Sequence, residues 1–343
     1  MKAILIVRLG ALGDVVHAMP VVAALRRQWP EARIDWLVDP RYVDVVQMVN
    51  GLNRAIPFDP RLLMVGRERG DALATIGGLR HERYDVVLDL QGLVKSAAAA
   101  RMAGGQQTIG FARAHLREPA ARFFYTRTAD VPAGIHIVEK NLALLTAIDV
   151  KPAEPEFALN LPRSPLVDGV MVRFGPDGYV AINPGAAWPN KRWPPERFGQ
   201  IAARIRDAYR LRTIVVWGPG EQSLAESVVA TSNGAAEIAP ATEIVELFGI
   251  FRGARLAVAG DTGPLHIAAA VGTPVVGLFG PTDPARNGPW RDDDISVSRV
   301  EQCECHYERR CRRPDPCIDD ISVDEVMKAV VSRLARVSRE AGA

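Results

Sequence analysis

Cysteine and long apolar runs are both scarce in this chain. Only four of its 343 residues are cysteine. No apolar run approaches the roughly 20 residues that a transmembrane helix needs. The apolar residues 3–7 are followed by Arg8 and lack the small-residue cleavage site of a signal peptide. We therefore expect a cytoplasmic protein without a transmembrane segment, peripheral at most on the inner face of the inner membrane, in a compartment where disulfides are rare.

Net charge and lysine are also low. The formal net charge is +2, so no global field draws the chain onto nucleic acid. Six of the 42 basic residues are lysine, which makes each lysine worth inspecting. An apolar content of 48% with 24% charged residues is typical of globular proteins. A chain of this length is too long for one ordinary core and fits two domains of about 150 residues.

Strand and helix patterns alternate along the chain, which indicates parallel sheets covered on both faces. In the first half we expect strands at residues 3–7, 33–38 and 85–90, and helices at 14–29, 43–49, 93–102 and 138–148. In the second half we expect strands at 179–183, 213–217, 255–259 and 275–279, and helices at 195–208, 222–232, 243–251, 264–271 and 322–339. Residues 151–176 are rich in proline without a clear period, which places the domain boundary there.

The predicted fold class is α/β, with two doubly wound, Rossmann-like domains facing across a cleft. We expect an N-terminal domain at residues 1–165 and a second domain at 166–321. Residues 322–343 form a terminal helix that we expect to pack back on the N-terminal domain. Its apolar side comprises Val323, Val326, Val330, Val331 and Leu334.

The most informative stretch is residues 258–282, where a strand runs into Gly260-Asp261-Thr262-Gly263-Pro264 and a short helix. Thr262 is a good N-cap and Pro264 suits the first helical turn, so free backbone N–H groups should surround Gly263 and cradle a phosphate. Asp261 and His266 flank this turn and can hydrogen-bond sugar or phosphate oxygens. The alternative is an ordinary turn in which Asp and Thr only cap the helix.

Two further loops of the second half follow predicted strands. After residues 179–183, Gly185 leaves room for a ligand, and Lys191 can bring a point charge to a leaving diphosphate. After residues 213–217, Glu221 at a helix start can accept hydrogen bonds from ribose hydroxyls. The alternatives are that Lys191 is only solvated, and that Glu221 only interacts favourably with the helix dipole. Together the three loops predict one nucleotide-diphosphate pocket in the second domain.

The loop after the first strand, residues 8–20, carries Gly10 and Gly13, which permit a tight turn. Asp14 lies at the following helix start, where a carboxylate gains ~0.3–1 kcal/mol from the helix dipole. It is either a functional carboxylate or a plain cap. A nicotinamide-dinucleotide site is a weaker alternative, because the spacing is G-x-x-G rather than G-x-G-x-x-G. For that alternative Asp35 lies mid-strand, whereas Asp39 is better placed.

Several segments resemble one known family in order along nearly the whole chain. They are G-D-V-V-H-A-M-P, D-L-Q-G-L-V-K-S-A, G-F-A-R-A-H-L-R-E-P-A-A-R-F-F-Y, K-R-W-P, and D-T-G-P-L-H with G-P-T-D-P. These resemble the ADP-heptose:lipopolysaccharide heptosyltransferases of glycosyltransferase family 9, which have the GT-B architecture. Q-G-L-V-K-S and R-E-P-A-A-R-F-F-Y look most like heptosyltransferase I, which acts on the Kdo-lipid A inner core.

The resemblance implies roles for individual residues. Asp14 matches the general base, Lys191 the lysine near the donor diphosphate, and Glu221 the acid near the donor ribose. The donor-binding set is completed by Gly185, Asp261, Thr262, Gly263 and His266. Gly13, Lys95 and Arg117 match the acceptor side, where positive charge would meet Kdo carboxylates or lipid A phosphates. The basic stretches between Arg61 and Arg127 fit an anionic lipid acceptor or a solvated arginine-rich surface.

The implied reaction is an inverting displacement that transfers L-glycero-D-manno-heptose from ADP-heptose to the Kdo-lipid A inner core. We see no D-x-D metal site in the matching segments, so we expect no cofactor in catalysis. Alternatives within the fold are another sugar or a protein acceptor, as in autotransporter heptosyltransferases, whose extra N-terminal sequence is not seen here. An alternative from another class is a dinucleotide-dependent oxidoreductase.

The four cysteines fall together, at Cys303, Cys305, Cys311 and Cys317. Four clustered thiols suit a tetrahedral Zn or Fe ion, although the C-x-C-x₅-C-x₅-C spacing is not that of a standard zinc finger. The related autotransporter heptosyltransferases imply iron at such a cluster. A structural metal and reduced free thiols are therefore the two alternatives.

Overall fold

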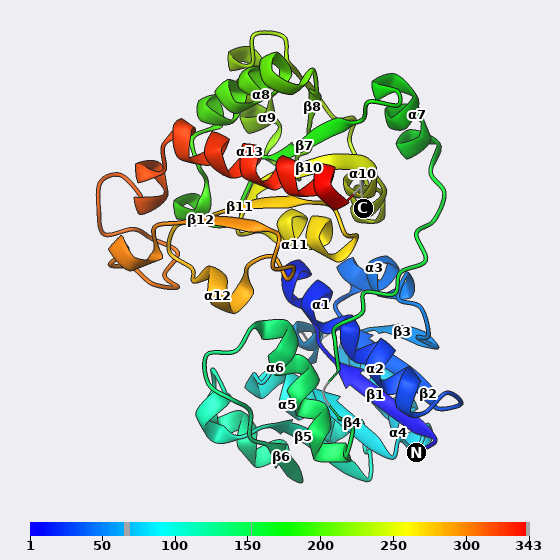
Figure 1. Cartoon of the computed structure of the whole chain (residues 1–343). Helices are drawn as coiled ribbons and strands as arrows, with labels where there is room; N and C mark the ends of the chain where they lie inside the picture. Colours follow the sequence, from blue (N-terminus) through cyan, green and yellow to red (C-terminus); the bar gives the residue numbers. More distant parts are fainter. Residues whose placement is uncertain (65–68, 152, 341–343) are drawn as a thin grey trace. The chain divides into compact units, whose positions relative to one another are not determined.

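The computed structural model describes residues 1–64, 69–151 and 153–340. The chain divides into two compact units, Met1–Asn160 and Leu161–Ala343 (Figure 1). Residues 65–68 of the expected basic stretch and residues 341–343 of the expected terminal helix lie outside the described residues.

The first unit is built on a six-stranded parallel sheet in the order β3-β2-β1-β4-β5-β6. Its strands are β1 (Ala3–Val7), β2 (Arg33–Val38), β3 (Arg54–Pro57), β4 (Val86–Asp89), β5 (Gln107–Phe111) and β6 (Arg127–Ala129). Its helices are α1 (Leu12–Ala18), α2 (Pro20–Gln28), α3 (Val43–Gln47), α4 (Arg69–His81), α5 (Val94–Met102) and α6 (Ile137–Ala143). Short 3₁₀ helices include η3 (Arg113–His115) and η4 (Pro119–Phe124).

The second unit repeats this plan with the sheet order β12-β11-β10-β7-β8-β9. Its strands are β7 (Tyr179–Asn183), β8 (Arg212–Val215), β9 (Ala236–Ile238), β10 (Ala254–Gly260), β11 (Val275–Phe279) and β12 (Ile295–Ser298). Its helices are α7 (Pro165–Phe174), α8 (Pro195–Tyr209), α9 (Gln222–Thr231), α10 (Ile244–Gly253), α11 (Gly263–Ala270), α12 (Pro284–Asn287) and α13 (Val323–Glu340).

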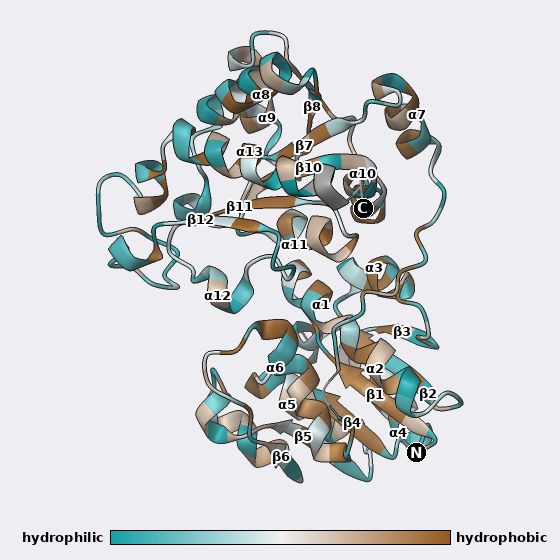
Figure 2. Cartoon of the chain, in the orientation of Figure 1, coloured by the Kyte–Doolittle hydropathy of each residue, from teal (hydrophilic) through white to brown (hydrophobic). Residues whose placement is uncertain are grey.

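Both sheets have the strand order 3-2-1-4-5-6 of a doubly wound Rossmann fold, counted within each unit. The central strands are apolar and buried along their length, because helices cover both faces of a parallel sheet. Figure 2 shows these strands in brown within each unit. The predicted α/β class with two Rossmann-like units is therefore confirmed. The strand order reverses between β1 and β4 in one unit and between β7 and β10 in the other.

Three expected elements differ from the structure. The helix expected over residues 138–148 is α6 followed by the 3₁₀ helix η5 (Leu144–Ile148). The helix expected over residues 14–29 is divided into α1 and α2, with Pro20 as the first residue of α2. Proline suits the first turn of a helix but cannot donate in its interior. The proline-rich segment 151–176 is also not all linker. It contains α7, whose start is capped by the Ser164 hydroxyl and has Pro165 in its first turn.

The terminal helix α13 packs within the second unit, against α8, β11 and β12. The expected apolar side is confirmed at Val326, Val330 and Leu334, which are buried, but Val331 is 42% exposed and Arg333 is fully buried. Arg333 donates from Nε to Asp294 Oδ1 at 2.9 Å. An ion pair and an apolar stripe therefore bind this helix to the second sheet, and the expectation that it packs on the N-terminal domain stays a prediction.

Among the described residues, no helix is both long enough and apolar enough to cross a membrane.

Candidate active site

The loops after β7 and β10 lie at the point where the strand order of the second sheet reverses. The two strands are neighbours, with Asn183 opposite Ala259 at their carboxyl ends. Ligands of open α/β sheets bind at such points, outside the carboxyl ends of the strands. These loops contain Gly185, Lys191, Asp261 and Thr262.

Asp261 is the centre of a hydrogen-bonded cluster in this place. Its carboxylate is 4% exposed and contacts four side chains. Oδ2 accepts from Lys191 Nζ at 2.5 Å and from Thr282 Oγ1 at 2.6 Å. Oδ1 accepts from Asn287 Nδ2 at 3.0 Å and lies 3.3 Å from His266 Nε2. The structure thus brings together the predicted residues Lys191, Asp261 and His266.

The charge state of Asp261 follows from these partners. Burial, the largest single influence, favours the neutral acid, but the hydrogen bond and charge of His266 and the charge of Lys191 outweigh it. The pKa of Asp261 consequently lies well below its ordinary value. The ionised carboxylate in turn holds the Lys191 ammonium in place, 4.6 Å from the centre of the Trp188 ring.

Thr282 and Asn287 were not singled out from the sequence. They follow β11, the strand next to β10, so their loop lies at the same edge of the sheet. Neighbouring parallel strands have their carboxyl ends at the same edge of the sheet, and this rule could have indicated Thr282 and Asn287.

The helix start beside Asp261 differs from expectation in one respect. Helix α11 begins at Gly263 with Thr262 at the N-cap position, but the Thr262 side chain makes no capping hydrogen bond. Its hydroxyl is buried and has no hydrogen-bond partner among the described residues. The predicted N-cap position of Thr262 is confirmed, but its side chain does not cap the helix. The Leu265 and His266 N–H groups donate to the Thr262 carbonyl and Pro264 has no N–H, so the expected ring of free N–H groups is reduced to the helix start at Gly263. A buried hydroxyl without a partner, next to this helix start and a lysine, suits an oxygen-rich ligand.

Gly185 and Glu221 meet at the neighbouring part of the same edge. A Cβ added to Gly185 would lie 2.0 Å from Glu221 Oε2, so the Glu221 carboxylate occupies the space that any side chain at residue 185 would need. Glu221 Oε2 accepts from the Gly218 N–H at 3.1 Å. The loops after β7 and β8 thus contact each other, and the space that Gly185 was expected to leave for a ligand is occupied by Glu221.

In the first unit, Asp14 lies in the first turn of α1, directly after β1. Its Oδ2 accepts from the Ala11 N–H at 3.2 Å, and its Oδ1 pairs with Arg8 at 2.7 Å. Arg8 is buried and also donates to the Leu90 carbonyl at 2.5 Å. Gly13 lies inside α1, so the expected turn ends before it. Arg8 was not predicted from the sequence, although it directly follows β1, where the strand order reverses, and this position could have indicated it.

The loop after β4 supports the Asp14 loop. Asp89 is fully buried, which raises its pKa, and it accepts from the Gln91 N–H at 2.9 Å and the Tyr125 hydroxyl at 2.7 Å. Gln91 in turn accepts from the Leu9 N–H at 2.9 Å. The backbone on both sides of Arg8 is therefore held by β4. The remaining acceptor-side candidates, Lys95 and Arg117, are exposed at the start of α5 and just before η4.

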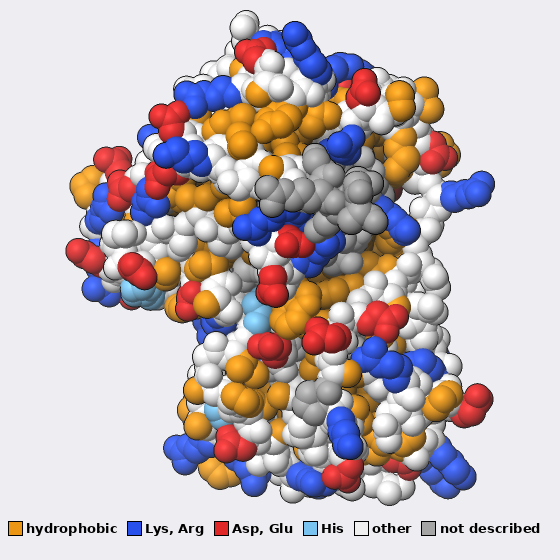
Figure 3. Space-filling model, viewed as in Figure 1, with side chains coloured by type: hydrophobic (Ala, Val, Ile, Leu, Met, Phe, Trp, Pro, Cys, Tyr) orange, Lys and Arg blue, Asp and Glu red, His pale blue; other side chains and the backbone are white. Residues whose placement is uncertain are grey.

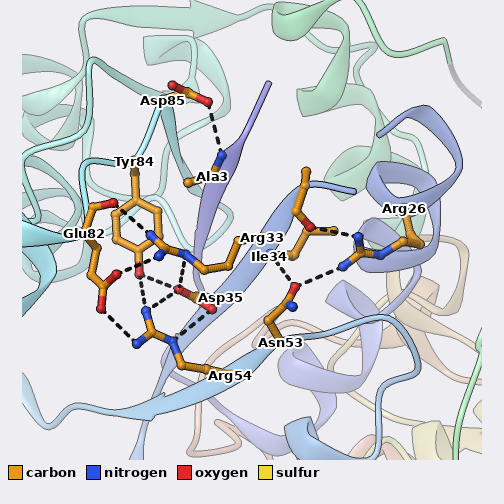
Figure 4. Close-up of polar contacts among 11 residues, drawn as sticks. Ala3, Arg26, Arg33, Ile34, Asp35, Asn53, Arg54, Glu82, Tyr84 and Asp85 are labelled. Atoms are coloured by element: carbon orange, nitrogen blue, oxygen red, sulfur yellow. Dashed lines mark hydrogen bonds and ion pairs between the residues drawn. The ribbon is translucent and has the colours of Figure 1, made fainter. Parts of the chain in front are cut away.

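The acidic residues of the nicotinamide alternative are engaged elsewhere. Asp35 is fully buried and binds Arg54 at 2.7 Å and the Tyr84 hydroxyl at 2.7 Å, as Figure 4 shows. Asp39 directly follows β2, but Arg41 donates hydrogen bonds to both of its carboxylate oxygens at 2.9 Å. These bonds lower the pKa of Asp39. Neither carboxylate is open to a ribose in the way that alternative requires.

The four cysteines gather in one small cluster of the second unit. Cys305 Sγ lies 3.5 Å from both Cys303 Sγ and Cys311 Sγ, and all four thiols are free. Burial, aided by a hydrogen bond with Cys303, raises the pKa of Cys317 to about 12. Within residues 1–64, 69–151 and 153–340, no group of three or more His, Cys, Asp or Glu side chains is arranged to hold a metal ion.

Comparison with known proteins gives consistent matches. Residues 73–315 match Glycosyltransferase family 9 (heptosyltransferase). Lipopolysaccharide heptosyltransferase 1 of Pseudomonas aeruginosa is 29% identical over 315 residues, covering 90% of this chain and 87% of the relative. The Escherichia coli K12 protein of the same name is 27% identical over 300 residues, covering 83% of this chain and 90% of the relative.

Solved structures have the same fold. The E. coli heptosyltransferase WaaC with ADP superposes with a TM-score of 0.80 at 23% identity, covering 97% of this chain and all of the other. The E. coli ADP-heptose lps heptosyltransferase II gives a TM-score of 0.77 at 19% identity, covering 98% of this chain and all of the other.

Proposed function

Because the chain belongs to glycosyltransferase family 9, a family of heptosyltransferases, we propose that it transfers L-glycero-D-manno-heptose from ADP-heptose to the Kdo-lipid A inner core of lipopolysaccharide. The names of the relatives favour this donor and pathway, and one similar structure holds ADP-2-deoxy-2-fluoro heptose. The observation that carries the proposal is the Asp261 cluster, in which Asp261 binds the Lys191 ammonium directly before a helix start with an unpartnered Thr262 hydroxyl.

The second unit binds the donor in this proposal. The Gly263 N–H and the Lys191 ammonium contact the diphosphate, and Glu221 accepts hydrogen bonds from the ribose. As the bond to the sugar breaks, negative charge develops on the departing ADP. A cation and an N–H group that are already in place stabilise that charge without reorganisation. Asp261, Thr282 and Asn287 keep the lysine and its loop in position.

The first unit binds the acceptor and supplies the base. Asp14 takes the proton of the acceptor hydroxyl while that oxygen attacks the anomeric carbon from the side opposite ADP, which inverts the configuration. General-base assistance of this kind contributes ~10²–10⁴-fold in rate. Gly13, Lys95 and Arg117 lie on the acceptor side, where the cations meet the anionic groups of the lipid. The lipid acceptor implies work at a membrane surface.

Nucleotide binding tests the donor site directly. ADP should raise the melting temperature of the wild type, whereas NAD should not. Lys191→Ala and Asp261→Ala should each abolish the ADP shift, because they remove the charge and its support. Lys151→Ala, an exposed lysine outside the cluster, is the matched control and should keep it. An ADP shift that survives in both cluster variants, or an NAD shift larger than that of ADP, would refute this site.

The cysteine cluster requires no part in catalysis. We propose that its two possible states, reduced thiols and a bound Zn or Fe ion, are distinguished by metal analysis of protein purified without chelator. A sulfur-only donor set suits Zn or Fe, and one equivalent of either per chain is the positive result. Less than a tenth of an equivalent of Zn or Fe per chain would show that the four cysteines are reduced thiols.

A further inference from the structure

Phe123 is the most exposed large hydrophobic side chain among the described residues, at 85%. Single exposed apolar residues are common, so its neighbours decide its meaning. Val94, at the start of α5, is 37% exposed, and the charged residues Lys95, Arg113 and Arg117 are exposed nearby in sequence and fold. We call these five residues the Phe123 patch. Figure 3 shows Lys and Arg beside hydrophobic side chains at the lower left of the first unit.

The patch stands on a well-anchored support. Helix η4 packs against α5 and η3. Glu118, next to the first residue of η4, accepts from the Val94 N–H at 2.7 Å, which ties Arg117 to the start of α5. On the inner side of η4, Ala121 is buried, and Tyr125 reaches the buried Asp89. Phe123 is therefore held outward by the burial of its neighbours.

The charge of the patch is positive and unbalanced. Lys95, Arg113 and Arg117 form no ion pair within the described part of the chain. Between residues 111 and 130 the carboxylates are Glu118 and Asp130, and both are engaged, with the Val94 N–H and with His115 Nε2 at 2.7 Å. Both keep their negative charge, but the three cations outnumber Glu118, the carboxylate that adjoins them, so the patch stays net positive.

We propose that the Phe123 patch docks on the anionic surface of a phospholipid bilayer, with Phe123 inserted at the headgroup level. An aromatic side chain flanked by Lys and Arg is the chemistry that binds peripherally to anionic lipid. A protein partner fits less well, because Phe123 and Val94 offer much less apolar area than a stable interface needs. The patch shares Lys95 and Arg117 with the acceptor side of the proposed function, but the inference goes beyond the transfer reaction because it concerns bulk anionic lipid.

Sedimentation with vesicles tests the docking without any reaction. The full chain is mixed with vesicles of phosphatidylcholine, with or without about one third phosphatidylglycerol, and neither contains the acceptor lipid. The wild type should bind the anionic vesicles, and binding should disappear at 0.5 M salt, where the Debye length falls to roughly 4 Å. Arg113→Gln should weaken binding about fivefold, the typical effect of one cation near such a surface.

Phe123→Ser should lose most of the vesicle binding. The matched control is Val172→Ser, because Val172 is 83% exposed but lies in α7 of the second unit. The control should bind as the wild type does. Unchanged melting temperature and ADP shift in Phe123→Ser show that the variant is folded.

Three outcomes would overturn the proposal: equal binding to neutral and anionic vesicles, undiminished binding by Phe123→Ser, or an equal loss in Val172→Ser. A dimer by light scattering that Phe123→Ser abolishes, without vesicle binding, would assign the patch to a second copy of the chain instead. Because no acceptor is present, failure here leaves the transfer reaction untouched. Failure of the ADP tests likewise does not affect the docking proposal, which the vesicle assay tests independently.

Discussion

At the scale of single residues, Arg8 connects the core of the first unit to the proposed base. Its guanidinium is almost fully buried, which is costly for a charge without partners. The partners are the Leu90 carbonyl and the Asp14 carboxylate. Because Leu90 belongs to the loop that Asp89 anchors, the contact fixes one Asp14 oxygen relative to the sheet.

Arg8→Gln should therefore lower turnover roughly 10–100-fold, because a misplaced catalytic group costs about that much. The KM for donor and the ADP shift should remain unchanged, since the proposed nucleotide site lies in the other unit. Arg8→Lys should recover part of the loss. In an Asp14→Asn background the Arg8→Gln change should cost little more, because the group that it positions is already disabled. Additive losses in the double variant would show that Arg8 acts only on stability.

The sequence indicated the proposed donor-binding residues better than the residues that support them. Lys191, Asp261 and His266 follow strands and glycines in a recognisable order, and the structure joins them. Thr282 and Asn287 lie 21 and 26 residues from Asp261, and Arg8 reaches Leu90 across 82 residues. Such contacts depend on strand order, which no local pattern encodes. Thr262 shows the opposite case: its residue type suits side-chain capping, but the structure has no capping hydrogen bond from it.

At the scale of elements, the start of α13 combines a capping pair with an ion pair. The Ser322 hydroxyl accepts from the Glu325 N–H at 3.2 Å, and Glu325 accepts from the Ser322 N–H at 2.8 Å. Arg299 binds both Glu325 oxygens, at 2.6 and 2.7 Å. The Arg299 hydrogen bonds, followed by that of the Ser322 N–H, lower the pKa of Glu325 to about 2.

This pKa predicts a specific pH dependence of stability. A carboxyl group whose pKa falls on folding stabilises the fold above its unfolded value, near 4.5, and loses that contribution as pH falls toward 2. The melting temperature of the wild type should exceed that of Glu325→Gln at pH 6. The difference should shrink between pH 4.5 and 2. Because the side chain is 41% exposed, the effect should also shrink in high salt. A difference that is constant with pH would contradict the role of Glu325.

Element boundaries were predictable where burial sets a long pattern and not where short strands lie at sheet edges. The buried strands β1, β7 and β11 begin and end at the expected residues. The edge strands β3, β6, β9 and β12 have three or four residues each and were not expected. They pair on one side only, so they need little apolar sequence of their own. Helix α7 was hidden because Pro165 looks like a linker residue but starts the helix.

At the scale of the whole molecule, the alternation of strand and helix was sufficient to indicate two doubly wound units. Each sheet has the same strand order, and in each the reversal point carries the charged residues of the proposed site. The terminal helix could not be placed from its apolar residues alone. Its assignment depends on the buried Arg333–Asp294 pair, a polar contact inside an otherwise apolar face.

The most direct measurement is ADP release from ADP-heptose with two acceptors compared, Kdo-lipid A and its already heptosylated form. The wild type should release ADP rapidly with Kdo-lipid A and slowly with the heptosylated form. Asp14→Asn should release it ~10²–10⁴-fold more slowly while still showing the ADP melting shift. Near-normal release by Asp14→Asn would remove Asp14 as the base, and no release by the wild type with Kdo-lipid A would contradict the proposed transfer itself.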